Sequence, residues 1–130
     1  MEKPSFTINR TSRLITIRLN GEWDSAIDLE YLSELASIMQ QMRQGTWAIV
    51  VDIRNWYIDP DTAKQNTNYG LHLDRRNQIA EVWIIREHNQ AKHLDVFFNP
   101  LNFTPARVTS RQELEQWATD NHIELPEDLY

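Results

Sequence analysis

One uninterrupted apolar run constrains the fold of this chain more than any other stretch. It is Trp47-Ala48-Ile49-Val50-Val51, and it ends in Asp52. A short run that is rich in β-branched residues and lacks polar alternation is typical of a strand buried on both faces of a parallel sheet. Pro60 follows closely, and proline is favoured at the first position of a helix. The run therefore predicts a central strand, a loop over residues 53–59 and then a helix, with the working surface at the carboxyl end of the strand.

Alternating and helical patterns precede this strand. Apolar and polar residues alternate within Phe6–Ile8 and Ile15–Leu19, which predicts a leading hairpin. An amphipathic helix is expected to begin at Asp24 or Ser25, because apolar residues then recur at spacings of three and four. Gly45 is expected to end that helix region.

The second half of the chain alternates in the same way. A polar helix is expected from Pro60 to about Arg76. The later elements are a strand over residues 79–85, a short helix over 91–98, an edge strand over 106–108 and a last helix that the capping box Ser110–Glu113 opens. The acidic residues 124–130 are expected to fray.

The resulting order is β-β-α-β-α-β-α-β-α, which indicates an α/β fold. It predicts a mixed, mostly parallel sheet of about five strands with helices packed on it. A chain of 130 residues is typical of one domain. We expect a single domain over residues 1–130, with a core at about 5–122 and an acidic tail at 123–130.

Composition excludes several classes of partner. The formal net charge of -6 argues against nucleic acid. No apolar run approaches the ~18 residues of a membrane span, and no apolar signal core stands at the start. The chain lacks cysteine, so no disulfide or thiol chemistry is expected. We expect a cytoplasmic protein.

Catalytic and metal-binding patterns are absent from the sequence. The four histidines lack metal-ligand spacing, and the three glycines are too far apart for a phosphate loop. Carboxylates that could meet at the strand ends as a catalytic or metal-binding pair are Asp24, Asp52, Asp59, Asp61 and Asp74. Helix capping is the simpler role for several of them. We therefore expect no enzyme activity, no cofactor and no metal.

The five tryptophans are the most unusual count in the composition. Trp47, Trp83 and Trp117 lie in apolar patterns and are expected in the core. Trp23 and Trp56 fall in the two expected loops at one sheet edge. Two alternatives remain for this pair: exposed interface anchors, or lids that pack back onto the end of the sheet.

Three stretches resemble the STAS domain, the sulfate-transporter and anti-sigma-factor-antagonist fold, in its SpoIIAA-like form. The first is Gly21-Glu22-Trp23-Asp24 before a long helix, where the family commonly has Gly-Glu-Leu-Asp. The second is Val50-Val51-Asp52-Ile53, a loop, and then Tyr57-Ile58-Asp59 opening a helix. The third is Thr109–Trp117, a short strand that runs into a terminal helix.

The resemblance implies a bacterial regulatory module that docks another protein. In regulatory members, the Asp that matches Asp59 precedes a Ser that a partner kinase phosphorylates. Pro60 stands there in this chain and has no hydroxyl, so the family's switch cannot operate at that position. Thr62 is a displaced alternative acceptor.

We expect a non-catalytic, STAS-like interaction module without the phosphoserine switch. The expected partner-binding residues are Trp23, Asp24, Trp56, Tyr57, Asp59 and Asp61. The rival is a protein that binds a lipid or a small apolar ligand, because the STAS fold is similar to lipid-exchange domains. Phe97, Phe98, Leu101 and Phe103 would line the cavity of that rival. A homodimer through the aromatic patch is the third alternative.

Overall fold

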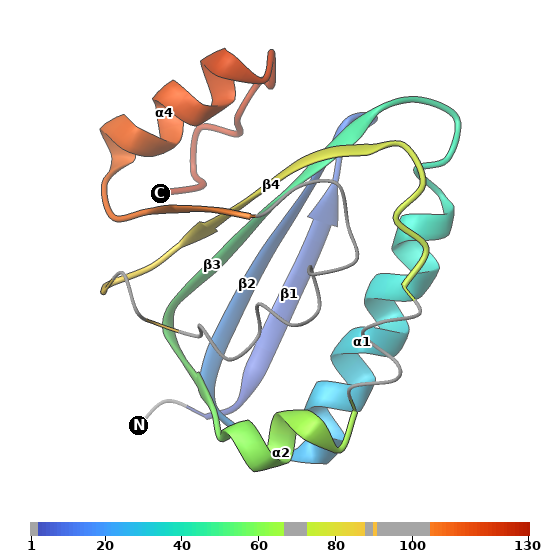
Figure 1. Cartoon of the computed structure of the whole chain (residues 1–130), viewed down its shortest axis with the longest axis vertical. Helices are drawn as coiled ribbons and strands as arrows, with labels where there is room; N and C mark the ends of the chain where they lie inside the picture. Colours follow the sequence, from blue (N-terminus) through green and yellow to red (C-terminus); the bar gives the residue numbers. More distant parts are fainter. Residues whose placement is uncertain (1–2, 67–72, 88–89, 91–104) are drawn as a thin grey trace.

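A computed structural model describes residues 3–66, 73–87, 90 and 105–130 of the chain. Its strands form one five-stranded sheet in the order β1-β2-β3-β4-β5. In chain order the elements are β1 (Ser5–Arg10), β2 (Leu14–Trp23), α1 (Ser25–Gln40), β3 (Trp47–Ile58), α2 (Pro60–Lys64), β4 (Gln78–Ile84), β5 (Ala106–Val108) and α4 (Arg111–Asp120). Figure 1 shows α1 and α4 on opposite sides of the sheet.

The strand directions confirm the predicted mixed sheet. β1 pairs antiparallel with β2, as the hairpin pattern predicts. The remaining neighbours, β2–β3, β3–β4 and β4–β5, all pair parallel. Parallel sheets need cover on both faces, and α1 and α4 with the segment after it provide that cover. The fold class expected from the sequence is therefore observed.

The opening run Trp47–Val51 lies at the middle of two hydrophobic cores. Trp47, Ile49 and Val51 pack on the α1 side of the sheet. Ala48 and Val50 pack on the α4 side. Each of these five side chains is at most 5% exposed. Burial on both faces explains why the run shows no polar alternation.

The strand β3 is longer than predicted, and the loop expected over residues 53–59 is wrong. β3 continues to Ile58, because its second half pairs with β2 from Asn20 to Trp23. The register shifts on the way: Arg18 pairs with Asp52, whereas Asn20 pairs with Asn55. β3 therefore carries one extra residue there, which is a β-bulge.

The bulge reverses which residues of β3 face α1. Before it, odd-numbered residues up to Ile53 pack on the α1 side; after it, Trp56 and Ile58 do. Tyr57 is consequently turned outward and is 47% exposed. A strand without the bulge would alternate with period two and would place Trp56 and Tyr57 the other way round.

Helix α2 is shorter than predicted. It ends at Lys64 with Gln65 as its C-cap, and residues 73–75 lie outside any helix. Its polar sequence offers only Ala63 as a buried residue, so little apolar burial stabilises further turns. The short helix expected over 91–98 lies outside the described residues, as do Phe97, Phe98, Leu101 and Phe103.

The C-terminal segment packs back onto the molecule, so the expected fraying is wrong. Ile123 is 8% exposed and belongs to the α4-side core, and Leu125 and Leu129 pack against that core. The Tyr130 hydroxyl donates to the Thr109 carbonyl at 3.1 Å. These apolar anchors outweigh the acidic composition of the segment.

The predicted capping box opens helix α4. The Ser110 Oγ accepts a hydrogen bond from the Glu113 N–H at 3.1 Å, and the Glu113 carboxylate accepts one from the Thr109 N–H at 3.2 Å. Among the described residues, no helix is long and apolar enough to cross a membrane.

Candidate functional site

The two tryptophans at the end of the sheet are buried, which decides between the sequence alternatives. Trp23 is 3% exposed and Trp56 is 8% exposed. Their ring centroids lie 5.6 Å apart in an edge-to-face contact. Phe6 and Tyr31 complete an edge-to-face cluster around Trp23. Of the two alternatives, the second is therefore observed: both indoles pack back as lids on the end of the sheet.

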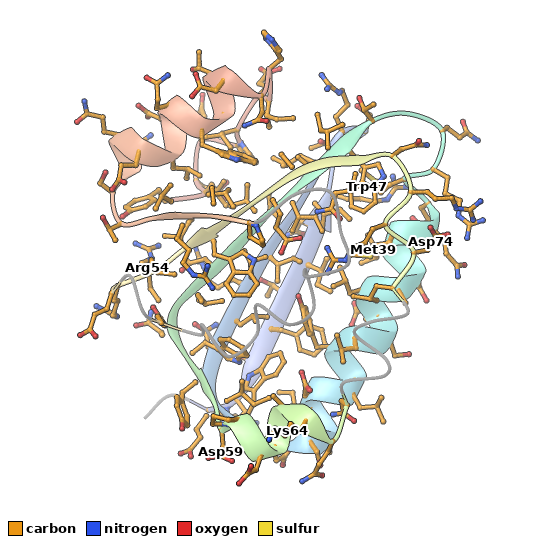
Figure 2. All side chains as sticks on the ribbon, in the orientation of Figure 1. Met39, Trp47, Arg54, Asp59, Lys64 and Asp74 are labelled. Atoms are coloured by element: carbon orange, nitrogen blue, oxygen red, sulfur yellow. The ribbon has the colours of Figure 1, made fainter. Side chains whose placement is uncertain are left out.

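The other predicted site residues stay on the surface at the same end of the molecule. The Asp24 Oδ1 accepts from the Ile27 N–H at 3.0 Å and caps α1. The Asp59 Oδ2 accepts from the Asp61 N–H at 3.0 Å and caps α2. Figure 2 shows Asp59 at this end, below the sheet. The capping roles expected for these carboxylates are observed.

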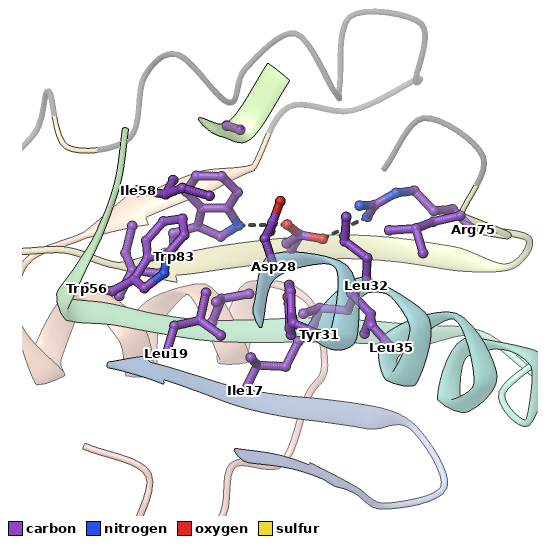
Figure 3. Close-up of a pocket in the computed structure, with 16 residues that line it drawn as sticks. Ile17, Leu19, Asp28, Tyr31, Leu32, Leu35, Trp56, Ile58, Arg75 and Trp83 are labelled. Atoms are coloured by element: carbon purple, nitrogen blue, oxygen red, sulfur yellow. Dashed lines mark hydrogen bonds and ion pairs between the residues drawn. The ribbon is translucent and has the colours of Figure 1, made fainter. Parts of the chain in front are cut away.

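A pocket opens beneath α1, directly behind the two buried tryptophans. Its volume is about 80 Å³, measured as the space open to the centre of a water-sized sphere. Its lining comes from β2, α1, β3, α2 and β4: Ile17, Leu19, Asp28, Tyr31, Leu32, Leu35, Ile49, Val51, Ile53, Trp56, Ile58, Ala63, Leu73, Arg75, Glu81 and Trp83. Figure 3 shows Trp56, Ile58 and Trp83 at one end and Arg75 at the other. The walls are mainly apolar.

A buried carboxylate forms the polar side of the pocket. Glu81 is 4% exposed, and its Oε2 accepts from the Trp83 Nε1–H at 2.6 Å. Its Oε1 accepts from Arg75 Nη1 and from Gln78 Nε2, each at 2.9 Å. The dashed lines at Trp83 and Arg75 in Figure 3 mark two of these bonds. A carboxylate with several donors is stable away from water, because each donor replaces a lost water.

Two further ionisable groups line the pocket, and burial raises the pKa of both. Burial raises the pKa of Tyr31, and the negative charge of Glu81 raises it further. Burial also raises the pKa of Asp28, although a hydrogen bond from Asn66 opposes that shift. The Asn66 Nδ2 donates to Asp28 Oδ2 at 3.1 Å and to the Ser25 carbonyl at 2.9 Å. These contacts tie the segment after α2 to the start of α1.

One buried donor in the pocket wall has no acceptor. No described residue accepts a hydrogen bond from the Trp56 Nε1–H. Three other indoles have acceptors: Trp23 donates to the Asn20 carbonyl at 2.8 Å, Trp47 to the Arg76 carbonyl at 2.8 Å, and Trp83 to Glu81. Leaving such a donor unsatisfied costs ~1–3 kcal/mol.

Arginines hold Asp52 and Asp74, two of the carboxylates considered as a catalytic or metal-binding pair. Asp52 accepts two hydrogen bonds from the Arg54 guanidinium, at 2.8 and 3.0 Å, and one from the Arg54 backbone N–H at 3.1 Å. It also forms an ion pair with Arg18 at 3.3 Å. Asp74 pairs instead with Arg43 and Arg76. Within the described part of the chain, no group of three or more His, Cys, Asp or Glu residues could hold a metal.

The buried Asp52 leads to a prediction on acid stability. Burial alone would raise its pKa, but the hydrogen bonds from Arg54 and the charges of Arg54 and Arg18 hold it below the usual 3.8. Its contribution to stability is therefore present above pH 3.8 and is lost as the pH falls through the depressed folded-state pKa. We expect Asp52→Asn to lower the free energy of unfolding at pH 7 by ~1–3 kcal/mol.

The measurement is urea denaturation from pH 7 down to about pH 2, a range that extends well below the usual aspartate pKa of 3.8. The gap between wild type and Asp52→Asn should narrow as the pH falls. Glu22→Gln, at an exposed carboxylate, is the control and should stay within ~0.5 kcal/mol of wild type. A gap of constant size at every pH would contradict the role given to the Asp52 charge.

The sheet order, the leading antiparallel pair and the helices on both faces define a STAS-type, SpoIIAA-like fold. The chain superposes on the crystal structure of an uncharacterized protein from the DUF3478 family with a SpoIIAA-like fold, from Shewanella loihica PV-4. The TM-score is 0.65 at 11% identity, over 90% of this chain and 96% of that chain. This likeness shows the fold and no more. No family model and no curated protein matches the sequence.

The sequence prediction did not include the polar groups of the pocket. Glu81 stands inside the otherwise apolar strand β4, and Arg75 precedes it by six residues. A carboxylate inside an apolar strand is buried, and a buried carboxylate needs hydrogen-bond donors. This rule could have identified Glu81 as a polar group of the core. Nothing in the sequence marked Asp28 as a pocket residue, because acidic side chains in the first turn of a helix usually face water.

Proposed function

We propose that this STAS-type chain is a non-catalytic module that docks another protein through the end of the sheet where β2 and β3 finish. One observation carries the proposal. Tyr57 is 47% exposed and pairs in register with the exposed Glu22. Asp24, Asp59 and Asp61 follow these two residues along the chain and are also exposed. We call these five residues the acidic Tyr57 surface.

The chemistry of this surface favours a basic partner. An exposed tyrosine offers a large, rigid apolar ring and a polar hydroxyl, which is typical of an interface anchor. Four carboxylates around it would attract a surface rich in lysine and arginine and speed its association. Asp24 and Asp59 also cap helices, and this fixes their position before a partner arrives.

Docking without a phosphorylation switch fits the residues at this end. Pro60 occupies the first position of α2, next to the Asp59 cap. Since proline carries no hydroxyl, binding here would not be regulated by a phosphate at that position. We propose no enzyme activity, because Asp52 and Asp74 are held in ion pairs and Asp24 and Asp59 in caps.

The test uses a photoreactive phenylalanine analogue in place of Tyr57, incorporated in the native cell. A partner cross-linked there is purified, and its affinity for variants is measured by calorimetry. We expect Tyr57→Ala to weaken binding by roughly 30-fold, as for an interface hot spot. We also expect Asp61→Asn to weaken the salt dependence of association.

Ile79→Ala is the matched control for Tyr57→Ala. Ile79 is 40% exposed and lies at the start of β4, at the opposite end of the sheet. Its removal should leave the affinity unchanged. Equal affinities for Tyr57→Ala and wild type would refute docking through this surface.

A homodimer through the same surface is disfavoured by charge. A two-fold interface brings the same patch of both copies together, so these carboxylates would face one another. Sedimentation velocity over a dilution series should therefore show no association that depends on Tyr57.

The pocket beneath α1 favours a second candidate function, the binding of a small apolar ligand. This open space of about 80 Å³ has mainly apolar walls, although the described residues that line it are not the ones predicted from the sequence for such a cavity. Binding there would be independent of the acidic Tyr57 surface, because the pocket lies on the inner side of Trp56.

A further inference from the structure

We propose that the pocket beneath α1 binds a small, uncharged, mainly apolar molecule with one acceptor oxygen, which accepts a hydrogen bond from the Trp56 Nε1–H. This inference rests on the second candidate function and specifies its ligand chemistry. The unsatisfied indole donor and the apolar pocket that Trp56 lines are separate observations that point to the same ligand. The donor itself has less than 1 Å² of accessible surface, so the ligand must displace the atoms that cover it.

The volume limits the size of the ligand. One water needs ~10–15 Å³ measured in this way, so about 80 Å³ exceeds the need of a single water several times. An engineered apolar cavity of ~150 Å³ holds benzene. A ligand of this pocket is therefore about the size of one small ring. The aliphatic and aromatic side chains of the lining favour such a molecule over water.

The charges of the pocket favour an uncharged ligand. Glu81 is already satisfied by Arg75, Gln78 and Trp83. An anionic ligand would lie close to the Glu81 carboxylate, and a cationic one would lie close to the Arg75 guanidinium in the same wall. Both would also lose their hydration among apolar side chains, which is costly for an ion.

The indole of Trp56 sets the required polar group. Figure 3 shows it among the apolar side chains at the end of the pocket that Ile58 and Trp83 share. Trp83 also lines this end, but its N–H is held by Glu81 at 2.6 Å. Trp56 therefore holds the unsatisfied donor at this end, and a group that satisfies it must accept. A carbonyl or ether oxygen meets this need without adding charge.

The experiment compares two probes with the same number of heavy atoms, cyclopentanone and methylcyclopentane. The ¹⁵N-labelled protein is titrated with each, and the indole N–H signals are followed by NMR. Trp56→Phe identifies the Trp56 signal by its disappearance. We expect cyclopentanone to shift this signal downfield to saturation, and methylcyclopentane to cause no downfield shift of it. The indole signals of Trp23 and Trp47, whose N–H groups already have acceptors, should move little.

Two variants keep the inference falsifiable. Trp56→Phe should weaken cyclopentanone binding about tenfold while leaving methylcyclopentane binding nearly unchanged. Ala63→Leu adds volume at a lining residue and should abolish binding of both probes. Dispersed amide spectra show that each variant is folded.

The outcomes separate this inference from the function on which it rests. Binding of both probes with a stationary Trp56 signal, and with affinities that Trp56→Phe does not change, would overturn the acceptor requirement and leave a ligand pocket in place. Binding of neither probe, or binding that survives Ala63→Leu, would overturn the pocket as a site. Neither outcome bears on docking through the acidic Tyr57 surface.

Discussion

Trp23→Ala is expected to lower the free energy of unfolding by ~3–5 kcal/mol, the cost of deleting a large buried aromatic side chain. Trp23 is 3% exposed and packs edge-to-face on three rings, with centroids 5.4 to 5.9 Å away. Its Nε1–H also donates to the Asn20 carbonyl at 2.8 Å. The truncation removes these contacts and leaves the Asn20 carbonyl without this donor.

Urea denaturation and thermal melting measure this effect, and we expect the Tm to fall by roughly 10–20 °C. Tyr57→Ala is the matched control, because Tyr57 is an exposed aromatic at the same end of the sheet. It should change the stability by no more than ~0.5 kcal/mol. Similar losses in the two variants would contradict the opposite burial of these residues.

Arg75→Met is expected to lower the free energy of unfolding by ~3–5 kcal/mol, because it leaves the buried charge of Glu81 without its cation. The Arg75 side chain is 13% exposed and that of Glu81 is 4% exposed. Methionine keeps much of the length and apolar volume of the arginine stem. The Glu81 charge then keeps only its uncharged donors Gln78 and Trp83, and the Gln78 Oε1 loses its bond from Arg75 at 3.0 Å.

A double-mutant cycle with Glu81→Gln tests this explanation. Glutamine keeps an acceptor for Trp83 and removes the charge. The double variant should therefore be more stable than Arg75→Met alone, with a coupling of ~1–3 kcal/mol. Chemical denaturation of the four proteins at neutral pH provides the cycle. Strict additivity would show that the ion pair between these side chains contributes little.

Much of the fold was predictable because its signals are local. The run Trp47–Val51 is apolar on both faces and could only be a central strand. The caps Asp24, Asp59 and Ser110 were identified from residue type and position, and all three accept the expected backbone bonds. Local chemistry of this kind depends on few neighbours, so it survives in any tertiary context.

The candidate site was predicted less well because it depends on pairing between distant segments. The second half of β3 exists because residues 20–23 of β2 lie alongside it, which no local pattern of 53–58 indicates. The burial of Trp56 follows from that pairing. The pocket was missed for the same reason, since Arg75 and Glu81 become partners only after the chain turns into β4.

The bulge in β3 has a consequence for how such a chain could change over generations. The extra residue lies between Asp52 and Asn55, and the pairing of Asn55–Ile58 with Asn20–Trp23 follows it. Loss of a single codon there would remove the bulge and leave this pairing in place, so Trp56 would stay inside and Tyr57 outside. The length of the chain can therefore vary at this point while the proposed ligand donor and the surface anchor keep their faces of the sheet.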